Sequence, residues 1–220
     1  MVSKHGKEKA TKTKTILILF VEGDTEVEFY KKLVSLLRKK SGQASCHIEI
    51  KNVKGIDNYQ NKVCRIFEKR IKIDYPDYKY IIALCYDTDV FEYSRKPSVD
   101  WNKVTKLLKE KGADQIQQVC ANKSIEDWFL LDKDGLRKFL NIPTNVKISG
   151  YQGQKGIVKL FKSANKTYAK GTPCKGLIDS LNIENFFPHI CQEIKVICNA
   201  IGLKCNECTE YCKNKSDKYT

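Results

Sequence analysis

The most constraining feature of the sequence is an apolar run that ends in a polar turn and is followed by residues with helical spacing. Residues Ile16 to Val21 are all apolar, which is typical of a strand buried on both faces of a parallel sheet. Gly23 lies in the turn, where Asp24 or Thr25 can accept hydrogen bonds from the first amides of a helix. Apolar residues then recur at helical spacing at Val27, Tyr30, Leu33, Val34 and Leu37. This segment predicts a strand, a tight turn and a helix.

Two glutamates flank this turn. Glu22 ends the strand and Glu26 lies in the first helical turn, so both should reach the crevice beyond the carboxyl end of the strand. Carboxylates placed together repel each other unless a cation or a proton lies between them, and a divalent metal ion would fill this role. The alternative is that Glu26 only complements the helix dipole and Glu22 is solvated. A P-loop is excluded, because the turn has one glycine and no GK[ST] sequence.

A second apolar run, Tyr80 to Tyr86, also ends in acidic residues, at Asp87 and Asp89. Alternation along an extended segment sends both carboxylates to the same side, where they could share one or two hard cations. The alternative is an Asx-type turn that ends the strand. With Glu22 and Glu26 at the same expected edge of the sheet, the acids predict a metal site.

The segments between and after these runs continue the α/β pattern. His47 to Val53 alternates apolar and polar residues as in a strand with one polar face, and Tyr59 to Ile71 has helical spacing. A further strand is expected at Ile116 to Cys120. The helix after it would begin near Ser124 as its N-cap, which places Ser124 and Glu126 at a third strand-to-helix junction.

Length and charge limit the class of protein. A chain of 220 residues can form one sizeable α/β core, and its formal net charge of +14 suits a polyanionic partner, although a basic chain can also simply be soluble. No stretch approaches the roughly 20 apolar residues of a membrane span, and Glu22 interrupts the first apolar run, so we expect a cytoplasmic protein that does not enter membranes. Residues Met1 to Lys14 are expected to form a basic flexible arm.

The ten cysteines are read as reduced, as is usual in the cytosol. Seven of them are expected to be thiols that mostly lie in apolar segments: Cys46, Cys64, Cys85, Cys120, Cys174, Cys191 and Cys198. Cys205, Cys208 and Cys212 have a C-x2-C-x3-C spacing that could hold a structural zinc ion, with Cys198 or His189 as fourth ligand. Without a second CxxC motif, a thiol-rich tail over residues 204–220 is the favoured interpretation.

The motifs VEGDTEVEFY, YDTD and SIEDW together resemble the TOPRIM domain of OLD-family nucleases and of the small RloB-like proteins of restriction and phage-defence loci. The resemblance covers about Thr15 to Asp132. It implies a Rossmann-like, mostly parallel sheet with helices on both faces. It further implies that the E-x3-E acids are Glu22 and Glu26, that the DxD pair is Asp87 and Asp89, and that the SxE element of a two-metal nuclease site is Ser124 and Glu126.

The activity implied by this resemblance is that of a divalent-metal-dependent endonuclease on DNA or RNA, in antiviral defence. One or two Mg²⁺ or Mn²⁺ ions would be held by Glu22, Glu26, Asp87, Asp89 and Glu126. A downstream lysine would neutralise developing charge, with Lys155 as first candidate and Lys170 as second. Lys159 and Lys162 would also bind nucleic acid, unless these lysines form a solvated face. OLD nucleases carry an ATPase domain that this sequence lacks, so a partner ATPase or restriction-system protein is an open expectation.

The remaining residues, 133–203, are expected to form a helical extension. Apolar residues within Glu184 to Ile201 have helical spacing and predict a helix that packs on the core or on a second copy of the chain in a homodimer. Two alternatives to a defence nuclease stay open: a maturation or toxin ribonuclease that cleaves tRNA or rRNA, and a nucleic-acid-binding or regulatory module without chemistry. Serine-histidine-aspartate chemistry is poorly supported, because no nucleophile motif accompanies His5, His47 or His189.

Overall fold

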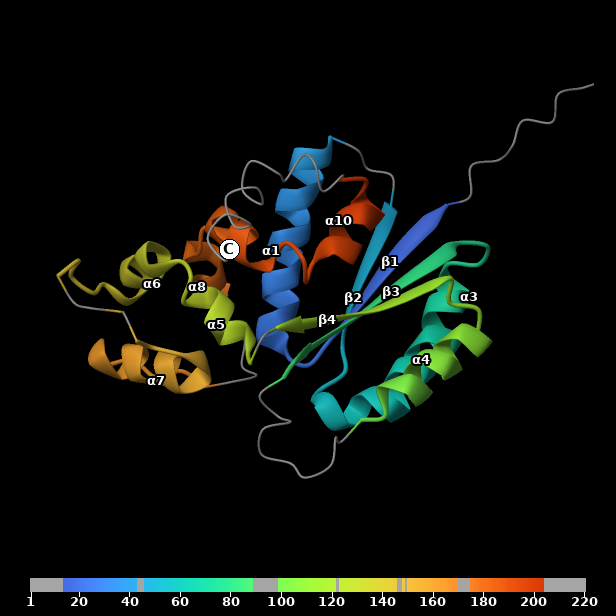
Figure 1. Cartoon of the computed structure of the whole chain (residues 1–220), viewed down its shortest axis with the longest axis horizontal. Coiled ribbons are helices and arrows are strands. Elements are labelled where there is room, and N and C mark those ends of the chain that lie inside the picture. The colour runs from blue at the N-terminus through green and yellow to red at the C-terminus, as the bar shows by residue number, and fades with distance from the viewer. Residues whose placement is uncertain are drawn as a thin grey trace, which may run out of the picture.

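The computed structural model describes residues 14–42, 46–88, 99–121, 123–145, 148, 150–169 and 175–203. Within these residues the chain is an α/β protein built on a four-stranded sheet (Figure 1). The strands are β1 (Thr15–Val21), β2 (Cys46–Asn52), β3 (Lys79–Asp87) and β4 (Gln115–Ala121). They are ordered β2-β1-β3-β4, and every pair is parallel. The expected parallel sheet is therefore confirmed.

Strand β1 lies in the interior of the sheet and is buried on both faces. Its alternate residues enter two separate hydrophobic clusters, which explains why the run is apolar without interruption. One cluster receives Leu17, Leu19 and Val21, and the other receives Ile16, Ile18 and Phe20; all six side chains are fully buried.

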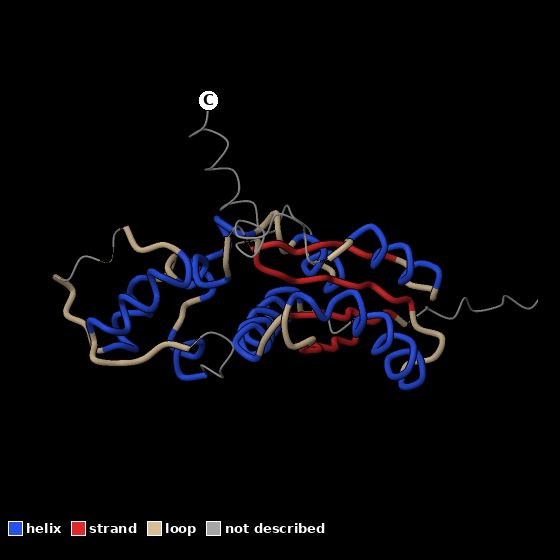
Figure 2. Tube along the Cα trace, turned by 90° about the horizontal axis from the view of Figure 1, so that it is seen from below, coloured by secondary structure: helices blue, strands red, loops and turns tan. Residues whose placement is uncertain are grey.

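Helices cover both faces of the sheet, as Figures 1 and 2 show. The face that receives Leu17 is covered by α1 (Asp24–Ser41) and α10 (Lys195–Ile201). The opposite face is covered by the helical segment between β2 and β3 and by α4 (Trp101–Glu110). The chain therefore leaves β1 toward one face of the sheet and reaches β3 from the other.

The N-cap of helix α1 lies one residue earlier than the first of the two expected N-cap residues. The N-cap is Gly23, whose backbone is extended and which has no side chain to bind the first amides, so the prediction of Asp24 or Thr25 was wrong. Both residues lie instead in the first helical turn. The Asp24 carboxylate accepts a hydrogen bond from Asn52 Nδ2 at 2.7 Å, which ties the start of α1 to the end of β2.

The helix expected at Tyr59 to Ile71 is present, but two of its turns are wider than an α-helix. The elements in order are η1 (Ile56–Asn58), the π-helical η2 (Tyr59–Val63), α2 (Cys64–Ile66), the π-helical η3 (Phe67–Ile71) and α3 (Lys72–Asp74). Fully buried residues recur at every fourth position, at Tyr59, Val63, Phe67 and Ile71. Because an α-helix repeats every 3.6 residues, such a series would drift around it, and wider turns keep the series on one face.

After β4 the chain forms short helical segments. They are α5 (Ile125–Phe129), α6 (Lys133–Leu140), α7 (Gly153–Ser163), α8 (Lys175–Ser180), η5 (Ile183–Phe186), α9 (Phe187–Ile190) and then α10. The single helix expected over Glu184 to Ile201 was wrong, because the segment is divided into η5, α9 and α10, with turn residues at 191–194 before α10. Proline lacks an amide proton and favours the first turn of a new helix, which is where Pro188 lies.

Two polar side chains hold these segments in place: Lys32 joins them to α1, and Asp132 joins two of them to each other. The Lys32 ammonium on α1 donates to the carbonyl oxygens of Ile178 at 2.7 Å and Asp179 at 2.8 Å, at the carboxyl end of α8. The buried Asp132 carboxylate accepts hydrogen bonds from the Asn182 amide at 2.6 Å and from Asn185 Nδ2 at 3.1 Å. A cation at the negative end of a helix and a carboxylate with two donors are both favourable placements.

The described cysteines are free thiols, as expected for a reduced protein. Four are buried, at Cys46, Cys64, Cys85 and Cys198, and Cys120 and Cys191 are partly buried. The remaining members, Cys174, Cys205, Cys208 and Cys212, lie outside the described residues, as does most of the expected basic arm. None of the helices in the described ranges combines the length and apolar character needed to cross a membrane.

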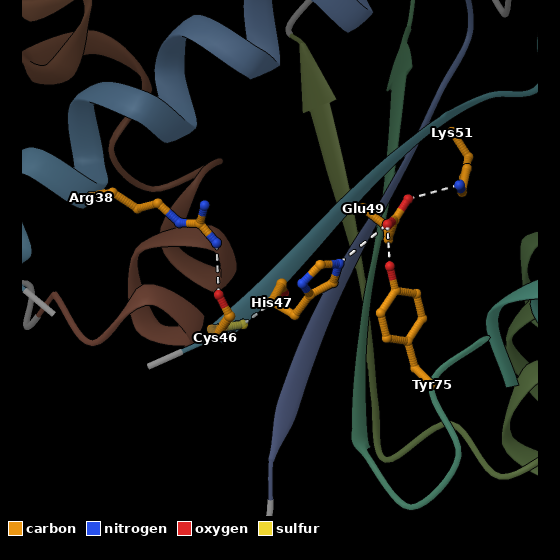
Figure 3. A network of polar contacts seen from close by, with 6 residues as sticks. All are labelled: Arg38, Cys46, His47, Glu49, Lys51 and Tyr75. Atoms are coloured by element: carbon orange, nitrogen blue, oxygen red, sulfur yellow. Dashed lines mark hydrogen bonds and ion pairs between the residues drawn. The ribbon is translucent and has the colours of Figure 1, made fainter. Parts of the chain in front are cut away.

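A network of polar side chains covers the edge strand β2 (Figure 3). The Glu49 carboxylate contacts three donors: Lys51 Nζ at 2.7 Å, the Tyr75 hydroxyl at 2.6 Å and His47 Nε2 at 3.2 Å. Burial by itself raises the pKa of Glu49, but hydrogen bonds from Lys51, Tyr75 and His47 outweigh it and lower the pKa to about 2. The hydrogen bond to Glu49 also raises the pKa of Tyr75 to about 12. The network thus anchors the segment after α3 to β2.

We expect replacement Glu49→Gln to remove a pH-dependent part of the stability. Because the folded-state pKa is lowered, the stabilisation is fully present above about pH 4.5 and is lost as the pH falls toward 2. At pH 7 the variant should be less stable by about 1–2 kcal/mol, after allowance for partial exposure of the network. Urea unfolding at several pH values measures this difference, which should shrink between pH 5 and pH 3. A difference that stays constant over this range would contradict the assignment. Tyr75→Phe, which removes one of the three donors to Glu49, should lower the free energy of unfolding by a smaller amount.

Candidate functional site at the carboxyl ends of β1 and β3

The sheet has a switch in strand order between β1 and β3. The chain passes from β1 to β2 on one side and then crosses to β3 on the other, so the two connections leave to opposite faces. The last residues paired between these strands are Phe20 and Leu84. Beyond them, Val21 pairs only with Asn52 of β2, while β3 continues along β4. Open α/β sheets bind ligands in the crevice at such a point.

The side chain of Tyr59 spans the two strands where they diverge. Its hydroxyl donates to the carbonyl oxygen of Phe20 at 3.0 Å and also to that of Cys85. The ring is fully buried and lies edge-on to Trp101, with centroids 5.2 Å apart. Burial raises the pKa of Tyr59 well above its usual value, and the nearby acidic groups Cys85, Glu22, Glu26 and Asp87 raise it further. Three of the predicted acids therefore lie near one buried hydroxyl.

Glu22 and Asp87 meet directly across this gap. Glu22 Oε1 accepts a hydrogen bond from the Asp87 amide at 2.8 Å. The Asp87 carboxylate, which is almost fully buried, accepts in turn from the Ile125 amide at 2.9 Å, at the start of α5. Each carboxylate is thus oriented by a backbone amide. Glu22 therefore contacts the backbone of Asp87 at one edge of the sheet, while the convergence of their carboxylates on one ion stays a prediction.

Glu26 lines an open cleft beside this contact, together with Glu22. The cleft has a volume of about 450 Å³. Its lining residues are Glu22, Gly23, Asp24, Glu26, Asn52, Lys54 and Gly55. Glu26 is 7% exposed, so its charge is held close to the protein interior. Asp87 is not among the residues that line this cleft.

Ser124 and Glu126 lie at the third junction, as predicted, but both are fully buried. Ser124 is the N-cap residue of α5, and Asp127 Oδ2 accepts from its amide at 3.3 Å and from its hydroxyl at 3.4 Å. Glu126 Oε1 accepts from the Tyr168 hydroxyl at 2.8 Å. Among the described residues, Glu126 Oε2 is buried without a hydrogen-bond partner. Neither Ser124 nor Glu126 lines the cleft of Glu22 and Glu26.

Three of the four lysines predicted to bind nucleic acid lie within the described residues. Lys155 and Lys159 are exposed on α7 and line a separate open cavity of about 930 Å³, and Lys162 is exposed on the same helix. The first residue of α7, Gly153, donates its amide to Asp127 Oδ1 at 2.7 Å, so α7 begins beside the start of α5. Asp89 and Lys170 lie outside the described residues.

The donor set of this site consists of carboxylate oxygens, which are the ligands that Mg²⁺ and Mn²⁺ prefer. Within the described ranges, no group of three or more histidine, cysteine, aspartate or glutamate residues is arranged to hold one ion. Asp89, two residues after Asp87, is the predicted ligand that those ranges omit. Within the part of the chain that is described, Glu126 Oε2 is buried without a hydrogen-bond partner and is therefore an oxygen that a cation could bind, because a buried carboxylate oxygen normally has a partner.

Sequence reasoning missed two residues of this site, Tyr59 and Lys54. Tyr59 was placed in a helix because of its apolar spacing, and no local pattern shows that its hydroxyl reaches strand ends 39 and 26 residues away. Lys54 lies in the turn before η1, which was read only as a connection. Gly55 was a usable signal for a turn at this point, since glycine tolerates the positive φ of 103° that it has there.

Comparison with known proteins found no matching family model, no matching curated protein and no matching solved structure. The resemblance to TOPRIM domains therefore stays a prediction. It rests on the three motifs and on their places at the strand ends.

We expect Tyr59→Phe to lower the free energy of unfolding by roughly 1–3 kcal/mol, because two buried carbonyl oxygens lose their donor while the ring is kept. Urea unfolding measures the loss. Tyr78→Phe is the matched control, since that side chain is only partly buried. Equal losses for the two variants would show that the bridging hydroxyl is not important for stability.

Proposed function

We propose that this protein is a divalent-metal-dependent nuclease that hydrolyses phosphodiester bonds of DNA or RNA. The observation that carries the proposal is the contact between Glu22 and the Asp87 amide, 2.8 Å apart, at the switch in strand order. Glu26 adds a third carboxylate at the same edge of the sheet. The net charge of +14 supports a polyanionic substrate, because lysine-phosphate contacts release counterions.

The residues that would hold the metal ion are Glu22, Glu26 and Asp87, with Asp89 and Glu126 as the further predicted ligands. A divalent ion bound there would activate water and stabilise charge on the scissile phosphate. The backbone amides of Asp87 and Ile125 orient the carboxylates of Glu22 and Asp87. Glu22 would also accept or return a proton.

The basic residues of α7 would contribute by binding the substrate. Lys155 lies two residues after Gly153, whose amide is bonded to Asp127 in the first turn of α5. The same α5 begins at the amide that Asp87 binds. This short series of contacts supports the proposal that Lys155, with Lys159 and Lys162, gathers phosphates close to the acids.

We expect purified protein to cleave plasmid DNA, single-stranded DNA or RNA in the presence of Mg²⁺ or Mn²⁺ and to stop when the metal is chelated. Asp87→Asn keeps an oxygen for the Ile125 amide but removes the charge, so activity should fall roughly a hundredfold or more, the scale of losing one charge-stabilising group. Glu110→Gln on the exposed surface of α4 is the control and should leave the rate unchanged. Equal rates for wild type and Asp87→Asn would contradict the site.

A further inference from the structure

Of the described residues that line the cleft of Glu22 and Glu26, one is basic, Lys54. The other charged side chains in its lining are Glu22, Asp24 and Glu26. None of the ion pairs found among the described residues involves Lys54. Its ammonium group is exposed and therefore available to a negative group that enters the cleft.

The backbone holds Lys54 in this position from both sides. Its φ of 64° is left-handed, which is unfavourable for a residue with a Cβ atom. Asn52 Oδ1 accepts from the Lys54 amide at 2.6 Å, and Asn58 Nδ2 donates to the Lys54 carbonyl oxygen. The next amide, that of Gly55, donates to the carbonyl oxygen of Glu22 at 2.8 Å. The turn is thus bonded directly to the residue that carries the first predicted ligand.

A second contact joins this turn to helix α1. Asn52 binds Lys54 through its oxygen and Asp24 through its amide nitrogen, at 2.7 Å. The backbone of Lys54 is therefore held relative to Glu22 and Asp24 by hydrogen bonds on two sides of the cleft.

The charges of the residues that line the cleft indicate what Lys54 could bind. Three carboxylates at one opening repel a phosphate group, and a cation held at the same opening offsets that repulsion. We propose that Lys54 binds a phosphate group of the nucleic acid at this cleft. The inference rests on the proposed function and adds to it a phosphate contact that lies beside the acids. Lys155 and Lys159 line a different cavity and would bind other phosphate groups of the same nucleic acid.

The test compares Lys54→Gln and Lys54→Arg with Lys69→Gln, which removes an exposed lysine from η3 that does not line the cleft. Binding of a fluorescent single-stranded oligonucleotide is measured by anisotropy with Ca²⁺ present, at several salt concentrations. We expect Lys54→Gln to weaken oligonucleotide binding about tenfold. The slope of the logarithm of the binding constant against the logarithm of the salt concentration should become less steep by about one, as expected for one lost phosphate contact. Lys54→Arg should retain most of the affinity, and Lys69→Gln should behave as wild type.

Two further measurements separate this inference from the proposed function. Mn²⁺ binding, measured by calorimetry, should be no weaker for Lys54→Gln than for wild type, because removing a cation from the acidic cleft does not oppose a divalent ion. The kcat/KM for cleavage should fall with the oligonucleotide affinity. If wild type binds oligonucleotide but does not cleave it, the proposed function fails, while the anisotropy series still tests Lys54. If Lys54→Gln and Lys69→Gln bind oligonucleotide equally well, or if Lys54→Gln loses Mn²⁺ affinity in parallel, the phosphate contact is overturned.

Discussion

The site depends on how the divergence of β1 and β3 is stabilised. Parallel strands that separate expose backbone groups with no partner on the other strand, and such groups are costly when buried. Here side chains supply the missing partners. The Tyr59 hydroxyl serves the carbonyl oxygens of Phe20 and Cys85, and the Glu22 carboxylate serves the Asp87 amide. The same contacts that allow the strands to part therefore bring the acidic side chains together.

The segments after β4 are joined to the sheet layer by both apolar and polar contacts. Their apolar residues enter the hydrophobic cluster that contains Leu17 and Leu19, so they share a core with the strands. Lys32 and Asp132 add directional contacts at the ends of short helices, where unpaired backbone groups occur. Short helices have little stability of their own, and these contacts compensate for their length.

The sheet was predictable from the sequence because its signals are local. The apolar run of β1 and the acids that follow β1 and β3 place Glu22 and Asp87 at one edge by topology alone. The role of Tyr59 was not predictable, because the two carbonyl oxygens that its hydroxyl contacts are distant in the chain and no local pattern marks them. Pro188 is a signal for the first turn of a new helix, whereas the apolar spacing around it predicts one continuous helix. The burial of Ser124 and Glu126 depends on α7 and Tyr168, whose positions no local motif specifies.

The hydrogen bond from the Ile125 amide to Asp87 has a mechanical consequence. Asp87 ends a central strand, Ile125 begins α5, and Asp127 in the same helical turn holds the first amide of α7. A shift of the Asp87 side chain must either break its bond to α5 or carry the helix with it. Through Asp127 and Gly153, that displacement would be passed to the lysine-bearing helix. The acidic edge and the basic helix are thus parts of one linkage, and they cannot move independently while these two bonds persist.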